Sequence, residues 1–286
     1  MAASTAALRG ITKQYKDFTL GPVDMTVPAG SIVGLIGENG AGKTTLLKIL
    51  CGVNRADDGT VDLLGGSPAD AATRAKIGVV FEDAFFYGSF TAAQVARSLA
   101  GMYGARWNAD SFSAHLRRFG LDAGKKLKEY SRGMRLKLSL AAALAHDPEL
   151  LVLDEATAGL DPVVRGELLD LFLEFIQDER HSIVMSSHIT ADLEQIADSI
   201  AYLHNGQLLF QENKDDLLQE YGVLHCGEDV LPSLPAGLVV FTKRGAYGCE
   251  SLVRERRTVQ ELLPEAVCDA ARLDDIMRFY SGRDAQ

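Results

Sequence analysis

The sequence predicts an α/β fold whose core is a parallel sheet. Two observations support this prediction. Short apolar runs rich in β-branched residues alternate with stretches of helical periodicity, and a glycine-rich loop joins one of those runs directly to a helix. Such alternation is typical of parallel strands connected by helices. Because strand patterns precede the loop and a long helical stretch interrupts the sheet, we also expect an N-terminal antiparallel β subdomain and a helical subdomain insert.

The expected elements can be placed in chain order. Apolar and turn-bounded runs predict the first strands and helices at 8–12, 19–27, 32–36, 45–50 (helix), 61–64 and 77–81. A segment of helical spacing follows from about 91 to 146. The sheet then resumes with strands at 150–153 and 182–185, helices at 162–177 and 191–197, a hairpin of 200–203 and 208–210, and a helix at 214–220.

A change of composition near Tyr221 predicts a domain boundary, because prolines and glycines become frequent after it. We expect residues 1–221 to form the main domain, with its helical subdomain at about 88–147. Residues 222–286 are expected to form a small α+β appendage of short strands, closed by a helix at about 269–280.

Composition excludes several classes of protein. The net charge of −10 would repel nucleic acid, and the dense basic cluster at 254–257 is expected to be a solvated turn. No apolar run approaches the roughly 18 residues of a spanning helix, and no leader segment is evident, so we expect a cytoplasmic protein. The four cysteines lack a C-x-x-C pair, which favours free thiols in a reducing compartment over a zinc site or disulfide framework.

The glycine loop 37–44 has the spacing G-x-x-x-x-G-K-[ST] and follows the buried strand predicted at 32–36. A strand that ends in such a loop and opens a helix directs successive backbone N–H groups and the positive helix end at one anion. Lys43 is expected to reach the β- and γ-phosphates of a nucleotide. Thr44 is expected to bind Mg²⁺, and Thr45 to lie on the α-phosphate side.

Two carboxylates, Asp154 and Glu155, stand at the end of the strand predicted at 150–153. Hydrolysis of a bound nucleotide needs one carboxylate to hold Mg²⁺ through water, which fits Asp154, and one to polarise the attacking water, which fits Glu155. The alternative is a strand end with two solvated acids. Together with the glycine loop, the pair favours a hydrolytic site.

A third signal is the helix start at Ser131-Arg132-Gly133-Met134, shortly before the strand that ends in Asp154. A serine and a glycine there offer a hydroxyl and bare N–H groups, which can form a second anion site or an ordinary N-cap. The position just before that strand favours the anion site.

These motifs together resemble the nucleotide-binding domain of ATP-binding cassette (ABC) proteins, which has the P-loop NTPase fold. The resemblance covers about residues 4–220 and, within the family, is greatest to the ATP-binding subunits of bacterial drug and peptide exporters. Five motifs occur in the family's order: the glycine loop, Ser131-Arg132-Gly133-Met134, Leu153-Asp154-Glu155, Ala158-Gly159-Leu160-Asp161 and Ser186-Ser187-His188.

The resemblance implies a role for each matching residue. Glu155 would be the general base, Asp154 would support the metal and His188 would contact the γ-phosphate. Tyr15 would stack on adenine, although a core tyrosine at a strand end is an alternative. The phosphates would be bound by Lys43, Thr44, Thr45 and the loop from Gly37, through Asn39, Gly40, Ala41 and Gly42. Ser131 and Gly133 would meet the ATP of a second subunit, with Asp161 near the shared interface.

The chain departs from the family pattern at two places. Glu82 replaces the usual glutamine that senses metal and the membrane partner, and its carboxylate is expected to contact Mg²⁺ through water. Arg132 and Met134 replace the usual glycine and glutamine, and Tyr130 the usual leucine, as occurs in exporter-type members.

The resemblance implies an ATP hydrolase that dimerises around two ATP–Mg²⁺, with a second copy or a homologous ATPase subunit. Its motion would drive separate integral membrane permease subunits that export their cargo, with the chain held on the inner face of the cell membrane. An aromatic surface for that partner, or simply core, is formed by Phe81, Phe85, Phe86, Tyr87 and Phe90. A soluble ABC ATPase of repair, translation or cluster assembly is the alternative, and a pseudoenzyme is disfavoured by the intact Glu155 and His188.

Overall fold

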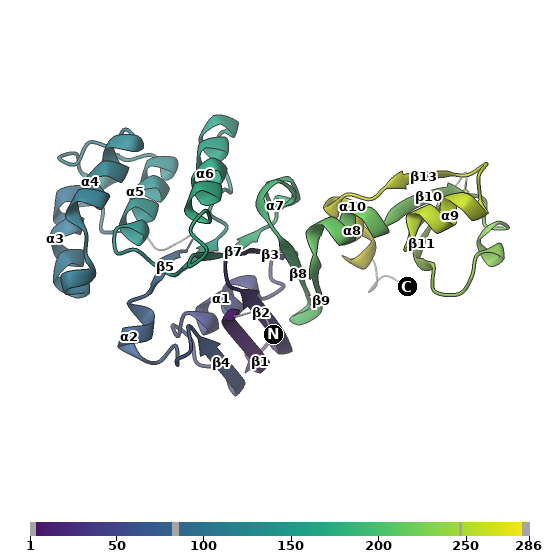
Figure 1. Ribbon diagram of the computed structural model, residues 1–286, viewed down its shortest axis with the longest axis horizontal. Helices are drawn as coiled ribbons and strands as arrows, with labels where there is room; N and C mark the ends of the chain where they lie inside the picture. Colours follow the sequence, from purple (N-terminus) through teal and green to yellow (C-terminus); the bar gives the residue numbers. More distant parts are fainter. Residues whose placement is uncertain (1–3, 82–85, 246–247, 282–286) are drawn as a thin grey trace. The chain divides into compact units, whose positions relative to one another are not determined.

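The computed structural model describes residues 4–81, 86–245 and 248–281 (Figure 1). It divides the chain into two compact units. The first takes the residues up to Ala197 together with Ala201–Gln211, and the second takes Asp198–Ile200 together with the residues from Glu212 onward.

A six-stranded sheet in the order β5-β6-β7-β3-β8-β9 forms the centre of the α/β fold. Its strands are β3 (Ile32–Ile36), β5 (Ile77–Val80), β6 (Leu150–Asp154), β7 (Ser182–Ser187), β8 (Ser199–His204) and β9 (Gln207–Asn213). The pairs β5·β6, β6·β7 and β3·β7 are parallel. Every residue of β3, β6 and β7 is buried, which explains their continuous apolar runs. The predicted parallel core is confirmed.

A three-stranded antiparallel sheet packs against this core, as predicted, and two of its strands precede the parallel strands in the chain. It consists of β1 (Ser4–Gln14), β2 (Thr19–Pro28) and β4 (Asp58–Leu63), in the order β2-β1-β4. Its inward side chains share one hydrophobic cluster with α1 (Lys43–Leu50) and the parallel strands. A one-turn helix, α2 (Ala71–Arg74), follows β4 and was not expected from the sequence.

The helical segment consists of α3 (Ala92–Tyr103), α4 (Ala109–Arg118) and α5 (Arg132–Leu144), with single 3₁₀ turns at Gly104–Arg106 and Leu127–Glu129. The three helices lie together in Figure 1 and enclose their own hydrophobic cluster. Thr91 starts α3 with a capping box, because its hydroxyl accepts from the Gln94 N–H while the Gln94 side chain accepts from the Thr91 N–H.

Two helices connect the later strands of the first unit, α6 (Pro162–Phe175) and α7 (Thr190–Ile196). Asp161 caps α6 and Pro162 opens it, an arrangement that suits the first helical turn. The turn between β8 and β9 is Asn205-Gly206, and both residues have positive φ, as the tightest hairpin turns require. The predicted hairpin is therefore confirmed.

The second unit is built on an antiparallel sheet in the order β11-β12-β10-β13. Its elements are α8 (Lys214–Glu220), β10 (Gly222–Cys226), a 3₁₀ turn (Leu231–Ser233), β11 (Val239–Gly245), β12 (Gly248–Val253), α9 (Arg256–Leu262), β13 (Val267–Ala270) and α10 (Leu273–Ser281). One sheet face shares a cluster with the turn and α9. Phe241 of β11 meets Tyr280 of α10 edge to face at 5.0 Å.

Two details of the C-terminal prediction differ from the structure. The closing helix begins at Leu273 and not at about 269, because Asp269 and Ala270 pair with β10 as part of β13. The second unit already begins at Glu212 and includes α8, whereas the sequence places the boundary near Tyr221. The functional division into 1–221 and 222–286, with a helical subdomain at about 88–147, stays a prediction. None of the helices in the described ranges combines the length and apolar composition that a membrane crossing requires.

Candidate functional site

The glycine loop connects the buried strand β3 to the N-terminus of α1. Gly40 and Gly42 have φ of +86° and +107°, and a Cβ atom on Gly42 would lie 2.8 Å from Cζ of Phe18. A side chain at Gly42 would therefore be both strained and crowded. The loop exposes backbone N–H groups at the positive end of α1, an arrangement that binds phosphate.

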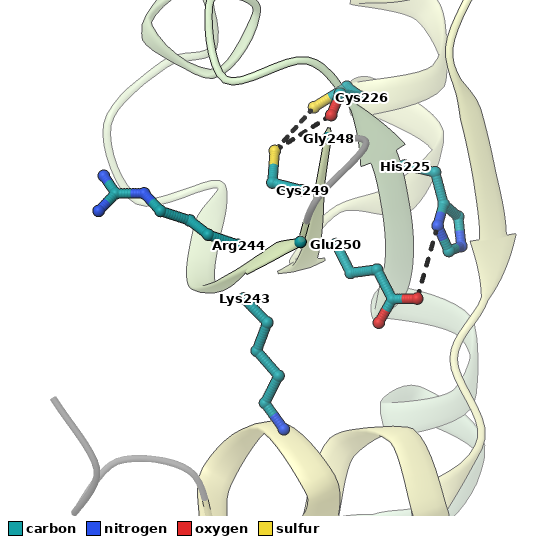
Figure 2. Close-up of a pocket in the computed structure, with 8 residues that line it drawn as sticks. His225, Cys226, Lys243, Arg244, Gly248, Cys249 and Glu250 are labelled. Atoms are coloured by element: carbon teal, nitrogen blue, oxygen red, sulfur yellow. Dashed lines mark hydrogen bonds and ion pairs between the residues drawn. The ribbon is translucent and has the colours of Figure 1, made fainter.

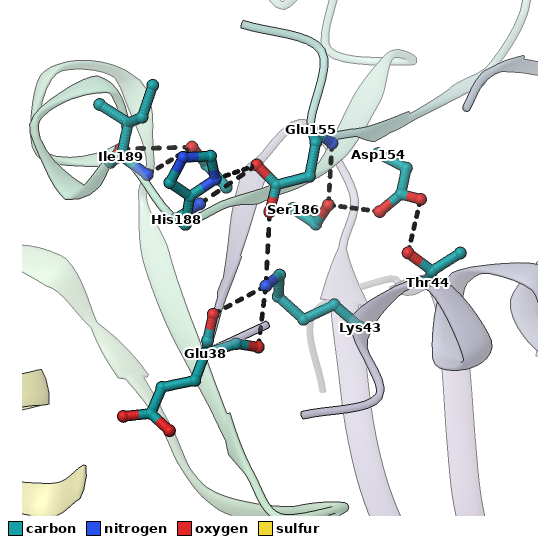
Figure 3. A network of polar contacts seen from close by, with 10 residues as sticks. Glu38, Lys43, Thr44, Asp154, Glu155, Ser186, His188 and Ile189 are labelled. Atoms are coloured by element: carbon teal, nitrogen blue, oxygen red, sulfur yellow. Dashed lines mark hydrogen bonds and ion pairs between the residues drawn. The ribbon is translucent and has the colours of Figure 1, made fainter. Parts of the chain in front are cut away.

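A hollow of about 240 Å³ lies at this loop. Its lining residues are Phe18, Glu38, Asn39, Gly40, Gly42, Lys43, Thr44, Thr45 and Glu155. The Lys43 side chain is 6% exposed, and its ammonium donates to the carbonyl of Gly37 at 2.7 Å and to that of Glu38 at 3.3 Å (Figure 3). The same ammonium lies 3.3 Å from Oε1 of Glu155. The structure thus brings the loop lysine and the strand-end glutamate together, as the sequence predicts.

A second chain of contacts links the loop to β6 and β7. The Thr44 hydroxyl donates to Oδ2 of Asp154 at 2.7 Å, and the Ser186 hydroxyl donates to Oδ1 at 2.7 Å. Ser186 also accepts from the backbone N–H of Glu155 at 3.0 Å. Asp154 is only 2% exposed, so these bonds hold a buried carboxylate in one orientation. The sequence predicts no separate role for Ser186 beyond its place in the motif Ser186-Ser187-His188.

The Thr44–Asp154 pair fits a magnesium ion in its donor chemistry. Both groups offer hard oxygen ligands, and Mg²⁺ is commonly held by one or two such ligands with waters and substrate phosphates completing its shell. Among the described residues no group of three or more histidines, cysteines and acids could hold a metal by itself.

Glu155 occupies an unusual backbone position for a residue with a side chain. Its φ is +52°, in the left-handed region, and such strain is found where function requires it. Its Oε2 lies 2.6 Å from Nδ1 of His188, whose backbone N–H also approaches it at 3.4 Å. The Glu155 carboxylate is therefore held between His188 and the Lys43 ammonium, and it lines the hollow at the glycine loop.

Ser131 and Gly133 lie at the start of α5 and Asp161 at the start of α6. Each of the two polar residues caps its helix: the Ser131 hydroxyl accepts from the Met134 N–H at 3.2 Å, and Asp161 accepts from the Val164 N–H at 3.0 Å. None of the three lines the hollow at the glycine loop. Within one chain, the structure does not bring them to the predicted phosphate site.

The start of α5 lies beside the loop that follows Glu155. A Cβ atom on Gly159 would lie 3.3 Å from a terminal nitrogen of Arg132, and one on Gly133 would lie 3.4 Å from Cδ2 of Leu160. Gly159 has φ of +70°, which favours glycine at this close approach. The two motifs therefore form one continuous surface.

Tyr15 follows β1 and is 42% exposed, so the alternative of a core tyrosine is wrong. Its ring centre lies 6.4 Å from that of Phe18, and its hydroxyl accepts from the Asn54 side-chain amide at 3.4 Å. Phe18, and not Tyr15, lines the hollow. Phe18 is a lining residue that the sequence motifs do not predict, although an aromatic residue shortly before β2 and close to Tyr15 is a usable signal.

Glu82 and Phe85 lie outside the described residues, so the predicted metal contact of Glu82 stays a prediction. A larger hollow of about 380 Å³ has Phe81 and Phe86 among its lining residues. It lies between the core and the helical subdomain and is lined by Cys51, Val53, Arg74, Ile77, Val79, Phe81, Phe86, Leu99, Tyr103, Ser139, Ala142 and Ala143.

The predicted aromatic surface is divided between interior and exterior. Phe86 and Phe90 pack against the hydrophobic cluster of the helical subdomain, whereas Tyr87 is 78% exposed. Phe81 and Phe86 also line the larger hollow. Tyr103 at its wall stacks on buried His146 at 4.1 Å, and burial raises the pKa of Tyr103 and lowers that of His146.

Comparison with known proteins gives consistent matches. A family model described as "ABC transporter" matches residues 20–158. An uncharacterized ABC transporter ATP-binding protein of Synechocystis is 38% identical over 206 residues, which cover 70% of this chain and 58% of that relative. The bacitracin transport ATP-binding protein of Enterococcus faecalis is 36% identical over 72% of this chain and 68% of its own length. A solved structure of an ATP-binding subunit of an ABC transporter matches with a TM-score of 0.68 and 28% identity, over 75% of this chain and 92% of its own.

Proposed function

We propose a function from one premise: this chain belongs to the ABC transporter ATP-binding proteins. It binds ATP with Mg²⁺, hydrolyses it, and passes the resulting motion to separate membrane-spanning chains. One observation carries this proposal: beside the glycine loop, the Glu155 carboxylate lies 3.3 Å from the Lys43 ammonium and 2.6 Å from Nδ1 of His188.

ATP binding uses groups that are already positioned. The N–H groups of the loop and of the first turn of α1 receive the phosphates, and the ammonium of Lys43 exchanges the carbonyls of Gly37 and Glu38 for phosphate oxygens. Because Lys43 also leaves Glu155, the carboxylate becomes free to accept another donor. Phe18 provides an apolar wall to the same hollow, and Tyr15 lies nearby for the base.

Bound Mg²⁺ would neutralise part of the phosphate charge. Thr44 and Asp154 would hold it, since their oxygens are 2.7 Å apart and both lie at the phosphate loop. Ser186 keeps Asp154 oriented by its bond to Oδ1. Glu82 is proposed as a further contact through water.

Hydrolysis requires a base that faces the γ-phosphate. Glu155 accepts a proton from the attacking water, and its carboxylate is oriented by His188 at 2.6 Å. For His188 to donate to Glu155, a proton must be on Nδ1, and a bond from Nε2 to a phosphate oxygen requires a second proton on Nε2, because phosphate oxygens only accept. The strained φ of +52° at Glu155 directs its side chain into this arrangement.

A second copy of the chain, or a homologous ATPase subunit, completes the site. At the start of α5, Ser131 is exposed and Gly133 is partly exposed, and neither lines the hollow at the glycine loop of its own chain. The surface that they form with exposed Gly159 supports a role at a subunit interface, with Asp161 beside it. In the dimer this surface meets the γ-phosphate of the partner's ATP.

The membrane-spanning partner binds at the larger hollow. This hollow is mainly apolar, and Val53 in its wall is 62% exposed. Tyr87, which follows the wall residue Phe86 in the sequence, is 78% exposed. Such a patch fits a short apolar helix of another chain. The chain is thereby held on the cytoplasmic face of the membrane, and the bacitracin transport relative supports export of drug-like or peptide cargo.

The test uses a tagged chain purified from its native membranes in mild detergent. A Val53→Asp variant places a charge at the hollow, and Val267→Asp, on β13, is the matched control because both valines are exposed. We expect an integral membrane protein to co-purify with the wild-type chain and with the control variant, and not with Val53→Asp. Recovery without any membrane protein would instead favour a soluble ABC ATPase.

A further inference from the structure

Two cysteines of the second unit face each other across adjacent strands. Cys226, the last residue of β10, is directly opposite Cys249 of β12 in the antiparallel register. Their sulfur atoms are 3.7 Å apart, as Figure 2 shows. Directly opposed residues of an antiparallel pair have Cα separations within the range that a disulfide spans, so bonding requires only a small movement of the side chains.

The pair lies at an open hollow of about 520 Å³. Cys226 is partly exposed there, whereas Cys249 is only 4% exposed. Arg244, directly opposite Cys249 on β11, lies at the same hollow with Lys243. Glu250 lines the hollow as well, Arg244 is paired with Glu228 at 2.9 Å, and the Lys243 ammonium donates to the Arg278 carbonyl at 2.7 Å. The approach to the two thiols therefore carries charges of both signs and is open to a small disulfide.

We propose that Cys226 and Cys249 are a reversible oxidation site that forms an intramolecular disulfide by exchange with a small disulfide such as oxidised glutathione. The Cys226 thiolate attacks one sulfur of the reagent, and the first reduced thiol leaves with a proton. The Cys249 thiolate then attacks the Cys226 sulfur and releases the second. Two electrons pass from the cysteine pair to the reagent, and the two cysteine protons end on the released thiols.

The roles of the two cysteines follow from their surroundings. Cys226 is the more accessible and attacks first, and Cys249 resolves the mixed disulfide from 3.7 Å. Burial, helped by the Cys249 hydrogen bond, raises the pKa of the Cys226 thiol to about 11, so the attacking thiol is protonated at rest and reacts slowly. The site therefore responds to sustained oxidising conditions and not to the ordinary reducing state.

The remaining cysteines provide internal controls. Cys51 lies in the first unit and is 2% exposed. Cys268 of β13 is opposite Leu224 and not opposite either member of the pair. Among the described residues, Cys226 and Cys249 are the one pair of cysteines whose sulfur atoms are in contact.

The test incubates the reduced full-length chain with oxidised glutathione and counts free thiols before and after. We expect two of the four thiols to be lost, one cross-linked peptide joining Cys226 to Cys249, and full recovery with dithiothreitol. Four unreacted thiols at equilibrium, or a cross-link between other cysteines or between chains, would overturn the proposal.

Single variants test the order of the steps. Cys249→Ser should accumulate glutathione on Cys226, because the resolving thiol is absent, whereas Cys226→Ser should acquire little. Cys51→Ser should still form the cross-link. Equal glutathione labelling of the first two variants, or loss of the cross-link in Cys51→Ser, would contradict the assigned roles. The proposal does not depend on ATP binding, so its failure would leave the proposed function untouched.

Discussion

Replacing Ser186 by alanine tests whether the buried serine positions Asp154, the carboxylate proposed to hold Mg²⁺. Ser186 is fully buried and donates at 2.7 Å to Asp154, which is 2% exposed. A hydrogen bond to a charged group contributes about 1.5–3 kcal/mol, so we expect Ser186→Ala to lose about 2 kcal/mol of unfolding free energy. For a unit of this size that corresponds to about 4–8 °C in melting temperature.

The more specific effect is on the Mg²⁺ requirement. With one oxygen of Asp154 released, the carboxylate is free to turn away from Thr44, and more Mg²⁺ is needed for half-maximal ATP turnover. The assay is a steady-state ATPase titration with Mg²⁺ at saturating ATP, beside a thermal melt.

Ser182→Ala is the matched control. Ser182 is on the same strand, β7, and is also fully buried, but its hydroxyl bonds to Thr5 and to main-chain atoms far from the carboxylates. It should lower the melting temperature without changing the Mg²⁺ requirement. An Mg²⁺ titration of Ser186→Ala that superimposes on that of Ser182→Ala would refute the positioning role.

Three other perturbations test separate parts of the site and the fold. His188→Ala should lower kcat about 5–30-fold and leave KM nearly unchanged, since the half-exposed histidine orients the base through one charge-assisted bond; an effect on KM alone would contradict this. Gly42→Ala should abolish nucleotide binding in an equilibrium titration, because its Cβ would lie 2.8 Å from Phe18 at φ +107°, whereas Gly101→Ala in open space should bind normally. Burial is the main cause that lowers the pKa of His146 in the folded chain. As pH falls, the unfolded chain therefore takes up the His146 proton at a higher pH than the folded chain, and the free energy of unfolding should decrease below about pH 6.5. Melting temperatures between neutral and mildly acidic pH should show this fall, and a His146→Gln variant should flatten it.

The parts of the fold that the sequence predicts best are those with a continuous local signal. The strand at Ile32–Ile36 was placed to the residue, and that at Leu150–Asp154 within one residue, because strands buried on both faces leave uninterrupted apolar runs. The glycine loop is predictable for a similar reason, because its whole motif lies within eight consecutive residues, 37–44, and depends on no distant contact.

Features that depend on distant packing were missed. Phe18 lines the nucleotide hollow because it packs against Gly42, a contact between segments whose approach no local pattern encodes. Ser186 acts through Asp154, 32 residues away along the chain. The opposition of Cys226 and Cys249 follows from the register of β10 with β12, which no cysteine spacing in the sequence indicates. The start of the closing helix was misplaced because pairing of Asp269 with Val223 overrides the local helical pattern.

The central claim is that Glu155 is the base of an ATP-hydrolysing site shared by two subunits. Its most direct test is ATP turnover by Glu155→Gln, with Glu179→Gln, at an exposed position away from the site, as the matched control. We predict that the Glu155 variant binds ATP, loses about 100-fold or more in turnover and accumulates as an ATP-dependent dimer on size exclusion. Turnover at the wild-type rate by Glu155→Gln would contradict the account.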